Sequence, residues 1–285
     1  MKNTFKYFLL LIIILLFGAC SKLNDNVPAA PEVNLHKEGI LNPASKNFHG
    51  TLIKNLMWDM RGCQQCHAAD YSGGIVESSC LTCHTQPEGP EACNTCHGDF
   101  SDPAKIAPPR DTEKNTSTDS VGVGAHVKHL YDNQIGKDIP CETCHKVPQQ
   151  VYEAGHVDTE LPAEIIFGDK AIINLGINSS YDATTATCSN TYCHGNWEFF
   201  RDSSANQFAY NSDRMIGNNQ SVVWNVVDGT QAGCGSCHNL PPDGHSNAQI
   251  SACGGCHSGI VDVNGEIVDS LRYKHINGEI NVFGN

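Results

Sequence analysis

A pair of cysteines followed at once by a histidine recurs seven times in this chain, and that repeat limits what the chain can fold into. The sequence has fifteen cysteines and fourteen histidines among 285 residues. Chance would place a histidine after a given cysteine about once in twenty, so seven in seven is not a coincidence. Six of the motifs read C-x-x-C-H, and the other, CSNTYCH at 188–194, has four residues between its cysteines.

Every cysteine except Cys20 belongs to one of these pairs. In chain order the pairs are Cys63 and Cys66, Cys80 and Cys83, Cys93 and Cys96, Cys141 and Cys144, Cys188 and Cys193, Cys234 and Cys237, Cys253 and Cys256. The histidines that follow them are His67, His84, His97, His145, His194, His238 and His257.

The spacing is typical of covalent haem attachment. In C-x-x-C-H the two thiols form thioethers with one edge of a porphyrin, and the histidine that follows binds the iron as proximal ligand. A zinc ribbon also uses C-x-x-C, but it needs four ligands on one metal and no histidine after each pair. A thioredoxin-like pair would occur once, and disulfides, common in exported chains, would not explain the spacing. We therefore predict seven covalently bound c-type haems.

The longer motif is interpreted as a functional variant of the other six. Cys188, Cys193 and His194 keep the same order and complete the set. A longer loop between two thioethers can bulge away from the ring while its ends stay attached. We expect both cysteines of this motif to be bonded to haem.

The histidines outside the motifs equal the haems in number. They are His36, His49, His126, His129, His156, His245 and His275. This is the count expected if every iron has two imidazole ligands, so we predict these residues as distal ligands. His126 and His129 are the best placed, because positions i and i+3 share one face of a helical turn and can serve two neighbouring haems.

The chain divides around a stretch rich in Pro, Ser, Thr and charge. We predict a three-haem module at 35–102, a linker at 103–120 and a four-haem module at 121–285 that contains the one CxxxxCH site. With only 7% aromatic residues, side chains alone would make a poor core. The expected fold is a multihaem cytochrome c of irregular loops and short helices packed on haems. Little sheet is expected, with a small hairpin near 160–177.

The two modules differ in their supply of histidines. The first module has three motif histidines and two other histidines. The second module has four motif histidines and five others. We therefore predict that His126 or His129 reaches back across the linker to the haem of His97. Two alternatives stay open: a sulfur ligand from Met57 or Met60, which would raise the potential of that haem, or an iron with an unligated sixth position.

The amino terminus predicts export. Lys2 and Lys6 precede an apolar run of eleven residues, 7–17, which is too short to cross a bilayer comfortably. Small residues then lead to Cys20, so residues 1–19 resemble a lipoprotein signal peptide and Cys20 is the expected lipidation site. Ser21, where inner-membrane lipoproteins typically have Asp, points to the outer membrane. Residues 20–34 are interpreted as a tether.

Several stretches resemble a known family. CSNTYCHG, CGSCHNLPPDGH and KHING resemble the multihaem c-type cytochromes with mixed CxxxxCH and CxxCH motifs that are abundant in metal-reducing bacteria such as Geobacter. The resemblance covers roughly 120–285 and implies electron transfer, often at or beyond the outer membrane. The resemblance also implies that the redox partners are other cytochromes and that an outer-membrane porin conduit is a further partner.

Two function classes fit the motifs. The first, which we favour, is an electron carrier that is not an enzyme and relays electrons at or across the outer membrane, on its periplasmic or outer side. The second is a multihaem reductase of the nitrite or hydroxylamine type, which needs one iron with an open position. Such reductases often replace the proximal histidine at the active haem, and none of the seven motifs here does. Assembly into a homopolymer is compatible with the carrier. The formal net charge of −13 argues against nucleic acid as a partner.

Overall fold

A computed structural model of the chain describes residues 35–98, 110–111, 113, 115–157, 163–173 and 178–284. The predicted signal peptide, Cys20 and the tether lie outside these residues, as does much of the predicted linker. The chain divides into two compact units, 1–52 and 53–285, and the second contains all seven haem motifs. Each unit is described by itself. The predicted module boundaries at 102 and 121 stay a prediction from the sequence.

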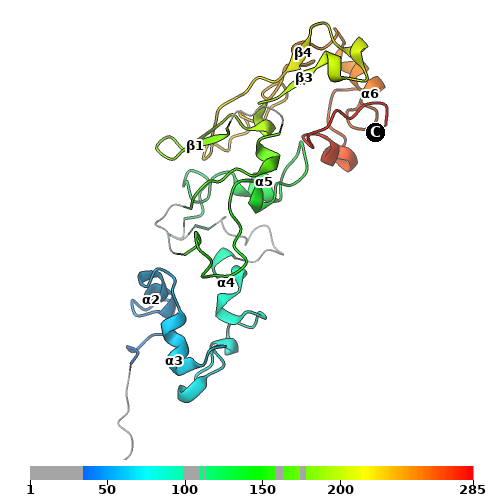
Figure 1. Cartoon of the computed structure of the whole chain (residues 1–285). Helices are drawn as coiled ribbons and strands as arrows, with labels where there is room; N and C mark the ends of the chain where they lie inside the picture. The colour runs from blue at the N-terminus through cyan, green and yellow to red at the C-terminus, as the bar shows by residue number, and fades with distance from the viewer. Residues whose placement is uncertain are drawn as a thin grey trace, which may run out of the picture. The chain divides into compact units, whose positions relative to one another are not determined.

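The helices are short, and several of them coincide with the motifs (Figure 1). The α-helices are α2 (His49–Asn55), α3 (Gln64–His67), α4 (Cys93–His97), α5 (His126–Leu130) and α6 (Cys253–Cys256). The 3-10 helices are η1 (Arg61–Cys63), η2 (Gly74–Val76), η3 (Cys80–Thr82), η4 (Gly89–Glu91), η5 (Cys141–Thr143), η6 (Asp169–Ala171), η7 (Tyr192–His194), η8 (Arg201–Ser203), η9 (Gln207–Ala209), η10 (Ile250–Ala252) and η11 (Asp269–Lys274).

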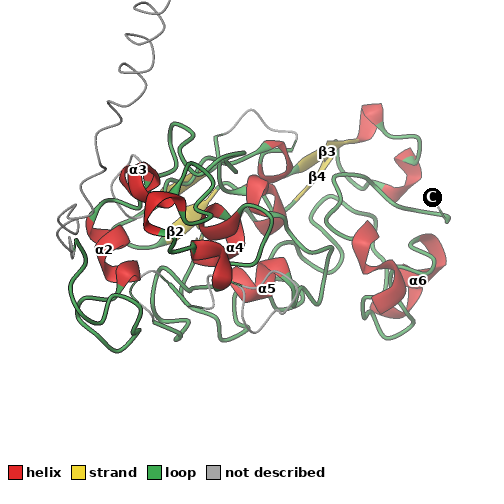
Figure 2. Cartoon of the chain, turned by 90° about the horizontal axis from the view of Figure 1, so that it is seen from below, coloured by secondary structure: helices red, strands yellow, loops and turns green. Residues whose placement is uncertain are grey.

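Within the described residues of the second unit, the strands form two small antiparallel sheets. One has the order β1 (Ser180–Asp182), β2 (Thr187–Ser189) and β5 (Val222–Val223). The other pairs β3 (Glu198–Phe200) with β4 (Arg214–Ile216). Loops connect these elements and dominate the chain (Figure 2). The prediction of mostly irregular structure with short helices and little sheet is confirmed, whereas packing on haems stays a prediction.

The predicted hairpin at 160–177 is wrong for the part that the structure describes, 163–173. That segment contains the 3-10 helix η6 and no strand. Its backbone donors are used elsewhere, because the amides of Ile166 and Gly168 donate to the carbonyls of Cys144 and Thr143. The described part of the segment therefore pairs with the motif of Cys141 and Cys144.

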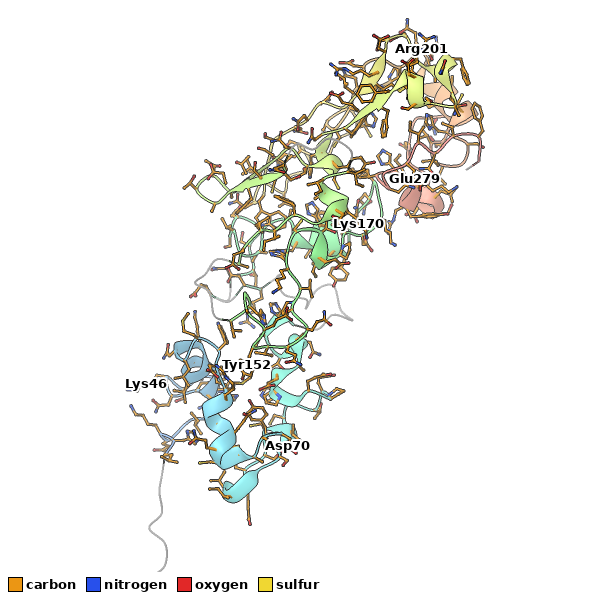
Figure 3. All side chains as sticks on the ribbon, in the orientation of Figure 1. Lys46, Asp70, Tyr152, Lys170, Arg201 and Glu279 are labelled. Carbon is orange, nitrogen blue, oxygen red and sulfur yellow. The ribbon has the colours of Figure 1, made fainter. Side chains whose placement is uncertain are left out.

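Few apolar side chains are buried in the described part of the chain. Met60, Tyr71, Val123, Tyr192 and Met215 are among the buried ones. Large apolar side chains such as those of Leu41, Ile75 and Val263 are more than 70% exposed. Figure 3 shows side chains standing along the ribbon throughout the described residues. Burial of apolar surface is the main favourable contribution to folding, and here side chains alone bury little of it.

Candidate haem-binding sites

Most motifs fold as a single helical turn that starts at or near the first cysteine. The amides of His84, His145 and His257 donate to the carbonyls of the first cysteines in their motifs, at 3.0, 2.9 and 2.9 Å. Residues three and four apart share a face of such a turn. The two thiols and the imidazole therefore leave the backbone on one side, as covalent attachment to one porphyrin requires.

The variant motif at 188–194 is built differently. Cys188 lies in β2, opposite Tyr181 of β1 and Val222 of β5, whereas Cys193 lies in the turn η7. Between them Asn190 adopts a left-handed backbone conformation, with φ of 58°. The motif thus joins a strand to a turn, and the two extra residues make that change of direction.

The residues between these two cysteines are packed into the protein. The carbonyl of Asn190 accepts hydrogen bonds from Ser179 Oγ and Asn196 Nδ2, both at 2.9 Å. Tyr192 is buried, and its hydroxyl accepts from the amide of Gly278 at 3.0 Å. The longer spacing is therefore integrated into the fold, and attachment of haem to both cysteines stays a prediction.

Four motif histidines each lie beside one histidine from outside the motifs. The pairs, with the distance between ring centroids and the interplanar angle, are His97 with His156 (6.1 Å, 23°), His145 with His126 (6.3 Å, 18°), His194 with His129 (6.3 Å, 58°) and His238 with His275 (6.2 Å, 71°).

The separation within these pairs suits an iron between two imidazoles. A metal–nitrogen bond is about 2 Å, and each nitrogen lies about 1 Å from its ring centre, so two axial imidazoles hold their centroids roughly 6 Å apart. All four pairs are near this value although their interplanar angles differ widely. The residues present therefore fit haem iron.

Hydrogen bonds to Nδ1 leave the other ring nitrogen available. Nδ1 lies 2.5–3.1 Å from a backbone carbonyl oxygen in His49, His67, His126, His129, His145, His156, His238, His245, His257 and His275. Because a carbonyl only accepts, Nδ1 carries the proton and Nε2 keeps its lone pair. This is the arrangement by which proteins orient a metal-binding histidine.

Burial keeps several of these imidazoles neutral. It lowers the pKa of His126 and of His194 to about 4, and it lowers the pKa values of His97, His129 and His275 as well. Desolvation disfavours the charged imidazolium form. At neutral pH these side chains are in the form that binds a metal.

Burial keeps three of the motif thiols protonated. It raises the pKa of Cys188 and of Cys193 to about 11 and that of Cys144 to about 12, because desolvation disfavours the thiolate. The fourteen motif cysteines form no disulfide with one another. In the described part of the chain, no group of three or more His, Cys, Asp or Glu side chains is arranged to hold a metal ion.

The sequence predicts that His126 or His129 lies beside His97, but the structure places another histidine there. His156, and not His126 or His129, lies beside His97. His126 and His129 instead face His145 and His194. That a histidine from beyond the predicted linker binds the haem of His97 stays a prediction.

The loop that carries His156 is held against the amino-terminal motifs by Tyr152 (Figure 3). The hydroxyl of Tyr152 accepts a hydrogen bond from the amide of Met60 at 3.1 Å, and the guanidinium of Arg61 lies 4.8 Å from the centre of its ring. A cation over an aromatic face is attracted by the ring's negative potential. These contacts explain why His156 is the residue that reaches His97.

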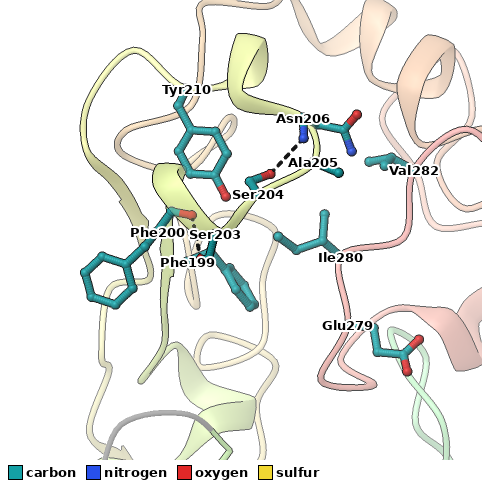
Figure 4. Close-up of a pocket in the computed structure, with 10 residues that line it drawn as sticks. All are labelled: Phe199, Phe200, Ser203, Ser204, Ala205, Asn206, Tyr210, Glu279, Ile280 and Val282. Atoms are coloured by element: carbon teal, nitrogen blue, oxygen red, sulfur yellow. Dashed lines mark hydrogen bonds between the residues drawn. The ribbon is translucent and has the colours of Figure 1, made fainter.

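A cavity of about 430 Å³ lies between the segment 199–210 and the segment 279–282 (Figure 4). Its walls include Tyr210 and Val282. Tyr210 forms a β-bridge with His245, and the carbonyl of Asn281, next to Val282, accepts from Nδ1 of His257. The buried hydroxyl of Tyr210 has no hydrogen-bond partner in the described residues. None of the described residues that line the cavity is a histidine or a cysteine.

The remaining predicted ligands lie in different units. His36 and His49 belong to the first unit, and His67 and His84 to the second. Nδ1 of His49 lies 3.1 Å from the carbonyl of Ile40, and that of His67 lies 2.7 Å from the carbonyl of Ser78. Which of these histidines share an iron stays a prediction from the ligand count.

Sequence reasoning missed Trp224. Its ring lies 4.6 Å from that of His126 and 5.5 Å from that of His129, measured between centroids. Nothing in the local sequence marks this tryptophan, because it is distant from both histidines along the chain. Only the pairing of β5 with β2 brings it there.

One comparison with known proteins matches part of this chain. Residues 187–238 match the family described as the Geobacter CxxxxCH...CXXCH motif, which here includes the variant motif and the motif of Cys234, Cys237 and His238. Neither a curated protein nor a solved structure matches. The match confirms the resemblance that the motifs indicate, supports covalently bound c-type haem, and is consistent with an exported multihaem c-type cytochrome. Among the described residues no helix is long and apolar enough to cross a membrane.

Proposed function

We propose that the chain is a seven-haem c-type cytochrome that relays electrons at or across the outer membrane. The observation that carries the proposal is the set of four histidine pairs at 6.1–6.3 Å, each joining a motif histidine to one outside the motifs. When bound, each haem supplies a one-electron iron couple whose potential depends on its axial ligands. The protein's part is to hold these ligands and exclude water from them.

The ligand arrangement favours a carrier over a reductase. In each of the four pairs both axial positions of an iron would be filled by imidazole, which leaves no position for a substrate. The count leaves one further histidine outside the motifs for each of the three other haems. With seven such haems the chain would carry electrons without binding a substrate at iron.

The first prediction is that the protein carries seven haems and that each haem iron has two imidazole ligands. Intact mass spectrometry of the purified protein should show seven covalent haems, and low-temperature EPR of the oxidised protein should show only low-spin iron. A high-spin signal equivalent to one iron would instead support the reductase. A mass corresponding to six haems, with the 188–193 peptide unmodified, would contradict attachment at the variant motif.

The proposed anchor is lipid on Cys20, which is the only cysteine outside the motifs. Several acyl chains bind a bilayer far more firmly than one, so the mature protein should sediment with membranes even in high salt. Cys20→Ser should move it to the soluble fraction with its haems intact. Persistent membrane binding of this variant in high salt would place the anchor elsewhere, and Ser21→Ala serves as the matched control.

A carrier of this kind needs an electron donor and an acceptor. We propose other cytochromes as partners, with an outer-membrane porin conduit or further copies of this chain as alternatives. The formal net charge of −13 favours partners that present a basic surface.

A further inference from the structure

Trp224 contacts two candidate iron ligands at once. Its indole ring meets the ring of His126 edge to face, at 86°, and lies nearly parallel to that of His129, at 30°. These histidines occupy one turn of α5 and face His145 and His194, the proximal ligands of two different motifs. A single side chain is thus placed to act on two haems.

The indole is held firmly from two directions. Trp224 directly follows β5, and its amide donates to the carbonyl of Ala186 at 2.7 Å, which continues the pairing of β5 with β2. On the other side, the indole Nε1 donates to the carbonyl of Val121 at 2.8 Å. The ring therefore connects the strand that carries Cys188 with the loop that leads into α5.

The loop before α5 is shaped to admit this ring. Gly124 has φ of +44°, and a Cβ at this position would lie 2.0 Å from Nε1 of Trp224. Any side chain there would displace the indole or the loop. The glycine thus provides the close approach of backbone and indole that the two histidine contacts require.

Each histidine has two constraints on its ring plane. Nδ1 of His126 lies 2.8 Å from the carbonyl of Val123, and Nδ1 of His129 lies 2.9 Å from that of Ala125. A hydrogen bond at Nδ1 directs Nε2, while contact with the indole limits rotation of the imidazole about that direction. Groups outside the first coordination sphere orient iron ligands and tune the metal in this way.

We infer that Trp224 is a positioning residue that sets the planes of the two distal imidazoles, and through them the electronic structure of two neighbouring haems. The inference rests on the proposed haem ligation. The interplanar angle is 18° for His126 with His145 and 58° for His129 with His194. The relative orientation of two axial imidazoles controls the splitting of the iron d orbitals. Nearly parallel planes give a rhombic low-spin EPR spectrum, and strongly inclined planes give a spectrum with a larger maximum g value.

The test compares EPR spectra and potentials of Trp224→Leu and Trp224→Phe with those of the unaltered protein. The leucine variant removes both ring contacts and the N–H donor, and the phenylalanine variant removes the donor but keeps an aromatic ring. We expect the signals of two haems to shift, more in the leucine variant, while the other five stay unchanged. His126→Met and His129→Met, each of which alters one haem, identify the two signals.

Trp58 provides the matched control, because it makes no ring contact with a histidine in the described residues. Trp58→Leu should leave all signals in place. If the EPR lines and potentials are unchanged in both Trp224 variants, Trp224 only fills space in the packing and the inference is wrong. A lower melting temperature alone would not change that conclusion. If Trp224→Leu loses haem, the EPR spectrum and the potentials of Trp224→Phe decide whether the indole positions the imidazoles. Absence of low-spin signals from the unaltered protein would overturn the proposed ligation instead.

Discussion

Replacing His156 by methionine will raise the reduction potential of one haem, that of the motif Cys93–His97. The ring of His156 lies 6.1 Å from that of His97, whereas no other non-motif histidine in the described part of the chain has a ring contact with His97. Exchanging an axial imidazole for a thioether favours the reduced iron, and axial ligands set haem potentials over a range of about 0.8 V. We expect a shift on the order of 0.1 V at this one haem, measured by a spectroscopic redox titration.

The affected haem can be identified by removing it. Cys93→Ala with Cys96→Ala should give a protein with one haem fewer by mass. In that background His156→Met should cause no further change in the titration. If the reduction potential still shifts in that background, His156 serves another iron. If His126→Met or His129→Met shifts the potential of the haem of His97, the ligand predicted from the sequence is the correct one.

The second large effect is expected from shortening the variant motif. Deleting Asn190 and Thr191 would produce C-S-Y-C-H, which satisfies the common motif on paper. In the structure, however, Thr191 is buried and Asn190 accepts hydrogen bonds from three side chains, those of Ser179, Asn196 and Asn219. Leaving such donors without partners costs about 1–3 kcal/mol each when they are buried.

Shortening the motif would also move Cys193 relative to Cys188, which is held in β2 between two neighbouring strands. We expect the deletion variant to accumulate poorly, to carry fewer haems by mass and to melt at a clearly lower temperature. Ser189→Ala is the control, since it removes only the exposed hydroxyl contact with Ser221 and should change stability by less than about 0.5 kcal/mol. A deletion variant with a full set of haems and an unchanged melting temperature would show that the extra residues are dispensable.

The chemistry of attachment could be predicted from the sequence because it is local. Two cysteines and the next histidine lie within one helical turn, so their spacing in the chain determines their spacing in space. The same holds for the irregular fold, since motifs such as Cys80–His84 and Cys253–His257 need only one turn each and leave little room for long elements. The hairpin at 160–177 failed because its residues favour strand locally, whereas their backbone donors pair with the motif of Cys144.

What the tertiary structure alone decided is which distant histidine lies beside each of four motif histidines. A distal histidine shares no turn with its proximal partner, and every such histidine has the same side chain, so counting them gives the number of ligands but not their pairing. His156 reaches His97 because Tyr152 is held by Met60 and Arg61, and Trp224 reaches α5 because β5 pairs with β2. These placements depend on contacts between segments far apart in the chain, for which the sequence has no local signal.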